Sequence, residues 1–194
     1  MSTLGTQPSP TLALPTTQAD QGIRAAASRR GDEALAASSI PGALGARCWW
    51  LGVHGGAGES SLAALFPGFP AAEHQWPVHR SARTRVVLVA RTNHRGMSAA
   101  QAAMRDWSVS YRDHIDVLGL VLIADRPGKL ARPLRDLRQD LAGATPNLWR
   151  LPWIESWAVG ESPSPVNAPT KEVEALRVGV TLAIRAAERD RNDG

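Results

Sequence analysis

The chain has 194 residues, a formal net charge of +4 and 43% hydrophobic residues, seven of them tryptophan. This composition argues against a disordered protein, and the longest apolar run, 117–124, is too short to span a bilayer. The lone cysteine, Cys48, excludes an internal disulfide, and the first residues lack the order of a signal peptide. We therefore expect a cytoplasmic protein that does not contact the membrane.

Arginine dominates the basic residues. Of the 22 basic side chains only Lys129 and Lys171 are lysines, so 20 are arginines. They are scattered along the chain and do not form the block of five or more that is typical of a nucleic-acid-binding tail. Weak DNA binding through a basic face stays an alternative function.

The first 45 residues predict a flexible leader, because they contain four prolines and show no sustained periodicity. An apolar strand at 46–53 and a short helix at 60–66 follow. Further strands are expected at 85–90, 117–124 and 147–151, with a weak edge strand at 74–78. Further helices are expected at 98–111, with Ser98 in a capping box, at 133–143, and from residue 170 onward.

This alternation of short apolar strands and amphipathic helices predicts an α/β fold. We expect a three-layer domain over 46–190, with helices on both faces of a mostly parallel sheet, and a tail at 191–194. In such sheets ligands bind beyond the carboxyl ends of the strands. Three groups of residues follow predicted strands at this edge, namely His54–Ser61, Arg91 with Asn93, and Asp125. Arg91, Asn93 and Asp125 are the expected rim of a site.

The segment that follows the first strand has the layout of a phosphate-binding loop. Its residues are His54, Gly55, Gly56, Ala57, Gly58, Glu59, Ser60 and Ser61. Glycines allow backbone N–H groups to approach an anion, and the following helix start adds partial positive charge. A working loop places lysine directly after the last glycine and then Ser or Thr for Mg²⁺. Here Glu59 takes the lysine position and Ser60 follows.

The loop resembles the deviant Walker A motif of the ParA/MinD superfamily of P-loop ATPases, Lys-Gly-Gly-x-Gly-Lys-Ser/Thr. The segments 86–90, 118–124 and 148–153 resemble later strands of that family. The chain also resembles an actinobacterial family of unknown function, often on mobile elements, with Trp-Trp-Leu-Gly-x-His-Gly-Gly-Ala-Gly and Leu-Trp-Arg-Leu-Pro-Trp blocks. The resemblance implies P-loop NTPase topology, ATP with Mg²⁺ as the cofactor, and a homodimer as a compatible state.

Two departures from the family motif predict that the chain is not an ATPase. His54 and Glu59 replace both motif lysines. A carboxylate about 4 Å from a phosphate charge is repelled by roughly 4 kcal/mol at an effective dielectric constant near 20. We therefore expect ATP and Mg²⁺ to bind weakly. Our hypothesis is that Glu59 fills or neutralises the anion site itself, and the alternative is that it points into water at a helix start.

No catalytic residue and no metal ligand is assigned. The five histidines show no ligand spacing on one element, and the loop lacks the closing glycine of a nucleophile elbow. Asp125 is either a Mg²⁺-linked carboxylate or the start of a turn. Trp153 and Trp157 either pack in the core or line a partner surface.

The predicted function is a degenerate ParA/MinD-like P-loop protein, a non-hydrolysing adaptor of a plasmid or mobile-element system that binds a protein partner. One alternative is an active nucleotide-dependent switch ATPase that uses Ser60 and Asp125. The other is a weak DNA-binding accessory protein, whose DNA affinity would fall steeply with salt.

Overall fold

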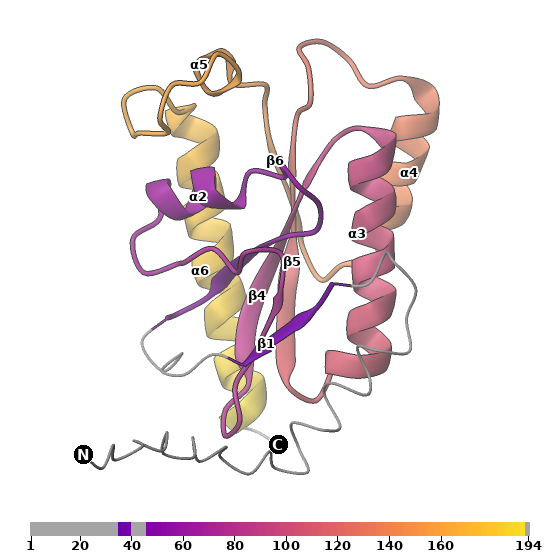
Figure 1. Ribbon diagram of the computed structural model, residues 1–194, viewed down its shortest axis with the longest axis vertical. Helices are drawn as coiled ribbons and strands as arrows, with labels where there is room; N and C mark the ends of the chain where they lie inside the picture. Colours follow the sequence, from indigo (N-terminus) through magenta and orange to yellow (C-terminus); the bar gives the residue numbers. More distant parts are fainter. Residues whose placement is uncertain (1–34, 40–45, 193–194) are drawn as a thin grey trace, which may run out of the picture.

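The computed structural model describes residues 35–39 and 46–192 (Figure 1). The strands of this part are β1 (Ala37–Ser39), β2 (Trp49–Gly52), β3 (Trp76–Val78), β4 (Thr84–Arg91), β5 (Ile115–Ile123) and β6 (Leu148–Leu151). The helices are α2 (Glu59–Leu65), α3 (His94–Asp106), α4 (Arg132–Ala144), α5 (Glu155–Ala158) and α6 (Thr170–Asn192), with a π-helical turn, η2 (Trp107–Tyr111), after α3. Each expected strand and helix from residue 46 onward has a counterpart here.

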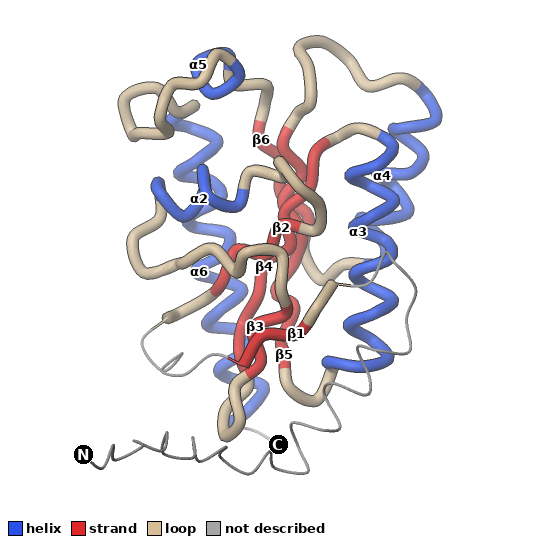
Figure 2. Tube along the Cα trace, viewed as in Figure 1, coloured by secondary structure: helices blue, strands red, loops and turns tan. Residues whose placement is uncertain are grey.

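Four parallel strands form the main sheet in the order β2-β4-β5-β6 (Figure 2). The strands therefore lie side by side in the order in which the chain makes them. β4 and β5 occupy the centre and are buried along almost their whole length, as expected for strands covered on both faces. Their ladder shifts register between Val86 and Val87.

Helices cover both faces of this sheet, α2 and α6 on one and α3 and α4 on the other (Figure 1). Two separate cores result because alternate strand residues point to opposite faces. Val86 and Leu88 pack with Met97 of α3, whereas Val87 and Val89 pack with Leu176 of α6. The predicted α/β class, with helices on both faces of a mostly parallel sheet, is confirmed.

A second, two-stranded sheet pairs β1 with β3 in parallel. β1 lies inside the segment predicted as a leader, where the sequence shows no strand pattern. Residues 1–34 and 40–45 of that leader lie outside the described residues. The expected edge strand at 74–78 exists as β3, but it pairs with β1, and Trp76 is fully buried against Tyr111 with ring centroids 5.2 Å apart. At the other end, α6 continues to Asn192, past the predicted boundary at 190.

The start of α3 corrects the predicted cap. The helix begins at His94, and the Asn93 side chain accepts a hydrogen bond from the Gly96 N–H at 2.8 Å. Asn is a strong N-cap residue, so Asn93 caps the helix, and Ser98, the predicted cap, lies inside its second turn. This shift matters for function because it fixes Asn93 at the carboxyl end of β4.

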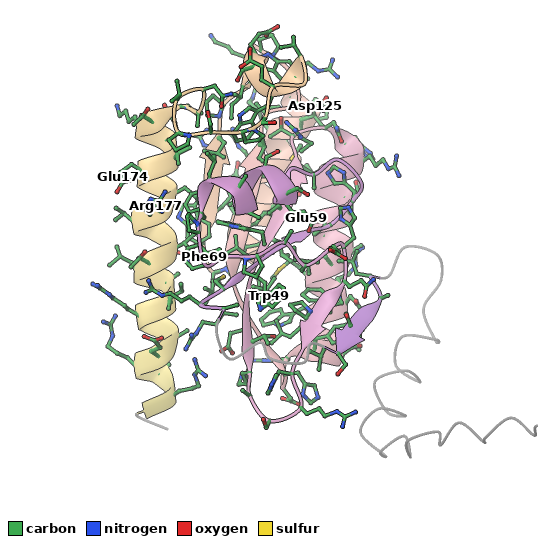
Figure 3. All side chains as sticks on the ribbon, turned by 60° about the vertical axis from the view of Figure 1, so that its left-hand side comes forward. Trp49, Glu59, Phe69, Asp125, Glu174 and Arg177 are labelled. Atoms are coloured by element: carbon green, nitrogen blue, oxygen red, sulfur yellow. The ribbon has the colours of Figure 1, made fainter. Side chains whose placement is uncertain are left out.

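The carboxyl end of α2 is held by α6. Arg177 donates from Nη2 to the Leu65 carbonyl at 3.2 Å, and its guanidinium lies 4.6 Å from the centre of the Phe66 ring. Figure 3 shows Arg177 on the side of α6 that faces Phe69. The Phe69 ring packs edge-on against Trp50, with the ring centroids 6.0 Å apart. These contacts secure a helix of only seven residues, and with it the loop that precedes it.

Candidate functional site

The glycine loop connects β2 to α2 in a conformation that needs its glycines. The Ala57 N–H donates to the His54 carbonyl at 3.1 Å, which closes a turn. Gly56 and Gly58 have φ values of 75° and 105°, in the left-handed region that favours glycine. A Cβ on Gly58 would also lie 2.7 Å from Ile123 Cδ1. This turn lies between β2 and α2, where the sequence places its glycine cluster.

Glu59 points into the protein, so the alternative interpretation, in which it points into water at a helix start, is wrong. The residue is 5% exposed, and its Oε2 accepts a hydrogen bond from the Gly52 N–H at 2.6 Å. Its Oε1 lies 3.3 Å from His74 Nδ1. Our hypothesis is that Glu59 fills or neutralises the anion site, and the filling is wrong, because these contacts reach Gly52 and His74 and none of the loop amides of residues 55–61.

His74 completes this arrangement from a distant part of the chain. Its Nδ1 lies 2.8 Å from the Gly52 carbonyl, which can only accept, so Nδ1 carries the proton and donates. Glu73 and His74 both have positive φ, 54° and 59°, a conformation that costs non-glycine residues on the order of 1–3 kcal/mol each. Gly52 is thereby held through its N–H by Glu59 and through its carbonyl by His74. Sequence reasoning missed His74, because nothing in its local pattern marks it.

His54 occupies the position of the first motif lysine, and both its ring nitrogens are engaged. Nε2 accepts a hydrogen bond from the Arg91 N–H at 3.1 Å, and Nδ1 lies 2.9 Å from the Gly55 carbonyl. Since Nε2 accepts and Nδ1 faces a carbonyl, the ring is the neutral tautomer protonated at Nδ1. His54 therefore ties the loop to the carboxyl end of β4.

Arg91 extends from the end of β4 across the loop. Its Nε donates to the Gly56 carbonyl at 3.1 Å and its Nη1 donates to the Ala124 carbonyl at 3.2 Å. Burial lowers the pKa of Arg91, and the nearby negative charge of Asp125 opposes that shift. The side chain joins the ends of three successive strands of the sheet.

Asn93 and Asp125 form the next layer of the same network. The Asn93 amide donates to Asp125 Oδ1 at 3.0 Å while its oxygen caps α3. The Asp125 N–H donates to Thr92 Oγ1 at 3.1 Å, and Arg126 lies 3.4 Å from the second carboxylate oxygen. Of the two interpretations of Asp125, the contacts favour the structural one, because both carboxylate oxygens are engaged by neighbouring side chains.

The three predicted segments meet at one hollow of about 400 Å³ at the carboxyl end of the sheet. His54, Gly55 and Gly56 line it with the predicted rim residues Arg91, Asn93 and Asp125. Figure 3 shows Asp125 at the end of the molecule that carries α5. That helix and the turn before it supply most of the remaining wall, with Trp153, Ile154, Trp157 and Ala158, and Arg95 completes it. The sequence did not predict this part of the wall.

The other loop residues lie outside this hollow. Ala57 and Glu59 are buried, Gly58 and Ser61 are half-buried, and Ser60 is exposed. Within residues 35–39 and 46–192, no three His, Cys, Asp or Glu side chains are grouped so that they could hold a metal ion. With a buried carboxylate where the family places its lysine, the residues do not fit MgATP in the manner of the Walker A loop.

The family model described as "Family of unknown function (DUF6668)" matches residues 46–175. The chain belongs to this family. The match begins just before β2 and includes the glycine loop, the whole four-stranded sheet and the start of α6. No curated protein and no solved structure matches the chain. Among the described helices, none combines the length and apolar character needed to cross a membrane.

Proposed function

We propose that this protein is a non-hydrolysing, P-loop-like adaptor that acts by binding a protein partner. The observation that carries the proposal is the position of Glu59. In a working loop this residue is a lysine aimed at the β- and γ-phosphates. Here it is a buried carboxylate on the Gly52 N–H, 3.3 Å from His74, so the position of the motif lysine supplies no cation to a phosphate.

The other polar groups of the site support the same proposal. His54, Arg91, Asn93 and Asp125 bond to one another, to the loop or to the strand ends. Groups that already hold the fold together lose those bonds if they turn to a ligand, and each such loss costs free energy. The site is therefore better suited to keeping one shape than to clamping and releasing a nucleotide.

We also propose that the fold is of the P-loop NTPase type. A glycine loop that leaves the first strand of a parallel sheet and enters a helix at the carboxyl edge is the feature that favours a P-loop type. The strand order β2-β4-β5-β6 shows no reversal among the described strands, so the loop lies beside an outer strand instead of at a switch point. The plasmid or mobile-element setting and a homodimer are proposed from the resemblance alone, and a cytoplasmic location is proposed from the composition of the chain.

Thermal melting of the full chain tests this function. Millimolar MgATP, MgADP and inorganic phosphate are added separately, and the midpoint temperature is compared with that of the free protein. A ligand at one hundred times its dissociation constant stabilises a fold by about 2.7 kcal/mol, which is easily visible. We expect no shift with any of the three. A saturable rise with MgATP, accompanied by phosphate release, would instead support the switch ATPase that uses Ser60 and Asp125.

A further inference from the structure

The outer edge of β6 is open among the described residues. β6 pairs with β5 and with no other described strand. The carbonyls of Asn147 and Leu151 accept hydrogen bonds from Leu120 and Ala124 of the β5 side. Because backbone groups alternate between the two edges of a strand, the N–H and C=O of Leu148 and Arg150 point away from the sheet.

A groove of about 1080 Å³ runs along this edge, between α4 and the first half of α6. Leu134 and Leu148 contribute apolar surface on the α4 side, and Trp149 and Leu176 contribute it on the α6 side. Small-molecule pockets measure roughly 300–1,000 Å³, so the volume of this groove lies just above that range. All four residues of β6 line it, at the edge where a fifth strand of the sheet would lie.

The groove is strongly basic. Five cationic side chains line it against one acidic side chain, Glu172; the cations are Arg126, Lys129, Arg135, Arg138 and Arg150. Asp136 lies in the adjoining hollow with Arg138 and Arg150. Within the described part of the chain, Lys129, Arg138 and Arg150 form no ion pair, and Arg126 pairs with its neighbour Asp125 at 3.4 Å. An occupant that complements this groove carries negative charge.

We propose that the groove binds an extended acidic segment of a protein partner, which adds to the sheet as a strand beside β6. Its backbone would pair with Leu148 and Arg150, and its acidic side chains would meet the cations on the α4 side. Alternate residues of a strand face opposite ways, so apolar residues between the acidic ones would face Trp149 and Leu176. Pro152 has no N–H, which ends the ladder one residue after β6.

The open backbone favours a peptide over a nucleic acid. Phosphate groups would satisfy the arginines and accept from N–H groups, but they offer no donor to the outward carbonyls of Leu148 and Arg150. A peptide strand supplies donors and acceptors in alternation. This inference rests on the proposed function in one respect, since both require a protein partner, and it specifies the chemistry of that partner.

The test measures fluorescence anisotropy of a labelled, end-capped peptide of alternating glutamate and valine as the full chain is added. We expect saturable binding. Two derivatives of the peptide are compared, one N-methylated at the backbone amides of the glutamates and the other at those of the valines. Successive N–H groups of a strand point to opposite edges, so each derivative loses the hydrogen-bond donors of one edge. Strand addition uses a single edge, so one derivative should lose binding at least tenfold while the other keeps it.

Charge variants locate the binding surface. Replacing both Arg138 and Arg150 by glutamate should weaken peptide binding at least tenfold. Arg105→Glu is the matched control, because Arg105 is exposed on α3 and does not line the groove, and it should leave binding unchanged. Melting curves of all variants exclude loss of the fold as the cause.

Three outcomes would overturn the inference. The first is equal tolerance of both N-methylated peptides. The second is tighter binding of a single-stranded DNA oligonucleotide, which would make nucleic acid the occupant. The third is displacement of the probe by a synthetic peptide of residues 1–34, which would make the chain its own occupant.

The groove proposal and the adaptor proposal can fail separately. If the peptide fails to bind and MgATP leaves the melting temperature unchanged, the groove proposal falls while the adaptor proposal stands. If the peptide binds as expected and MgATP raises the melting temperature, the adaptor proposal falls while the groove proposal stands.

Discussion

The glycine loop follows β2 at one edge of the main sheet and the groove lies along β6 at the other, and the polar groups of the two regions differ in one respect. In the loop region Glu59, His54, Arg91 and Asn93 all bond to other parts of the protein. In the groove the outward backbone of Leu148 and Arg150 and several cations lack partners among the described residues. In the loop region, these polar groups thus form hydrogen bonds within the protein. In the groove, backbone groups and cations are left that could bind a partner. A motif-like sequence therefore does not by itself mark where a partner binds.

The largest effect should come from the packing behind the loop. A Cβ on Gly96 would overlap the Arg91 carbonyl oxygen and lie 2.8 Å from His54 Nε2, so Gly96→Ala forces α3 away from the loop network. We expect a loss of about 3 kcal/mol in the free energy of unfolding, measured by urea denaturation. In Gly143→Ala, the matched change in α4, the new Cβ meets nothing within 4 Å, and the helix should gain up to about 1 kcal/mol. Equal effects of the two changes would show that the loop region is not tightly packed.

Removal of the Glu59 carboxylate should have the next largest effect. Glu59→Ala leaves the buried Gly52 N–H without its acceptor, which costs about 2 kcal/mol. Glu59→Gln keeps an acceptor oxygen and should lose less. Urea denaturation of both variants provides the measurement. If Glu59→Ala were as stable as the natural chain, the carboxylate would have no structural role.

A pH-dependent effect should come from Cys48, which is buried just before β2, at the end of that strand opposite the loop. Burial raises the pKa of its thiol from 9.0 to about 12. Between these values the folded state keeps a proton that the unfolded state has lost, so stability falls as pH rises, by up to about 1.4 kcal/mol per pH unit.

Comparison with Cys48→Ala isolates this contribution, because every other titrating group is common to both proteins. The difference in unfolding free energy between the two should shrink by about 1 kcal/mol from pH 9.5 to pH 10.5. A difference that stays constant over this interval would mean that water reaches the thiol in the folded state.

The smallest effect distinguishes the arginines of the two regions. Arg91→Met removes two hydrogen bonds from a half-buried guanidinium and should cost about 1 kcal/mol. Arg150→Met removes an exposed cation that forms no ion pair with the described residues, and the change should stay under about 0.5 kcal/mol. Chemical denaturation of both variants decides the comparison. A large loss for Arg150→Met would assign that side chain to the fold and remove it from the binding surface.

Much of this fold is predictable because apolar runs and helical spacing are local signals. The strands β4 and β5 and the helix α4 lie within a few residues of their predicted positions for that reason. The convergence of the loop with Arg91, Asn93 and Asp125 is predictable too, since the carboxyl ends of parallel strands share one edge. Strand β1 is not, because its three residues, Ala-Ser-Ser, carry no strand pattern and depend on pairing with β3.

The details of the site depend on contacts that sequence spacing does not encode. Glu59 is held by Gly52, seven residues earlier, and by His74, whose left-handed backbone conformation no pattern reveals. The groove cations are spread between residues 126 and 150, and the fold brings them to one groove from the loop before α4, from α4 and from β6. Their separation along the chain is why the arginines look scattered in the sequence.

The most direct test of the account follows the backbone amide signals of the ¹⁵N-labelled full chain during titration with MgATP and then with the glutamate–valine peptide. We expect MgATP to leave the amide signals of residues 55–61 unchanged, and the peptide to shift those of Leu148 and Arg150 in a saturable manner. Saturable shifts of residues 55–61 with MgATP would contradict the account, because the loop would then be a working nucleotide site.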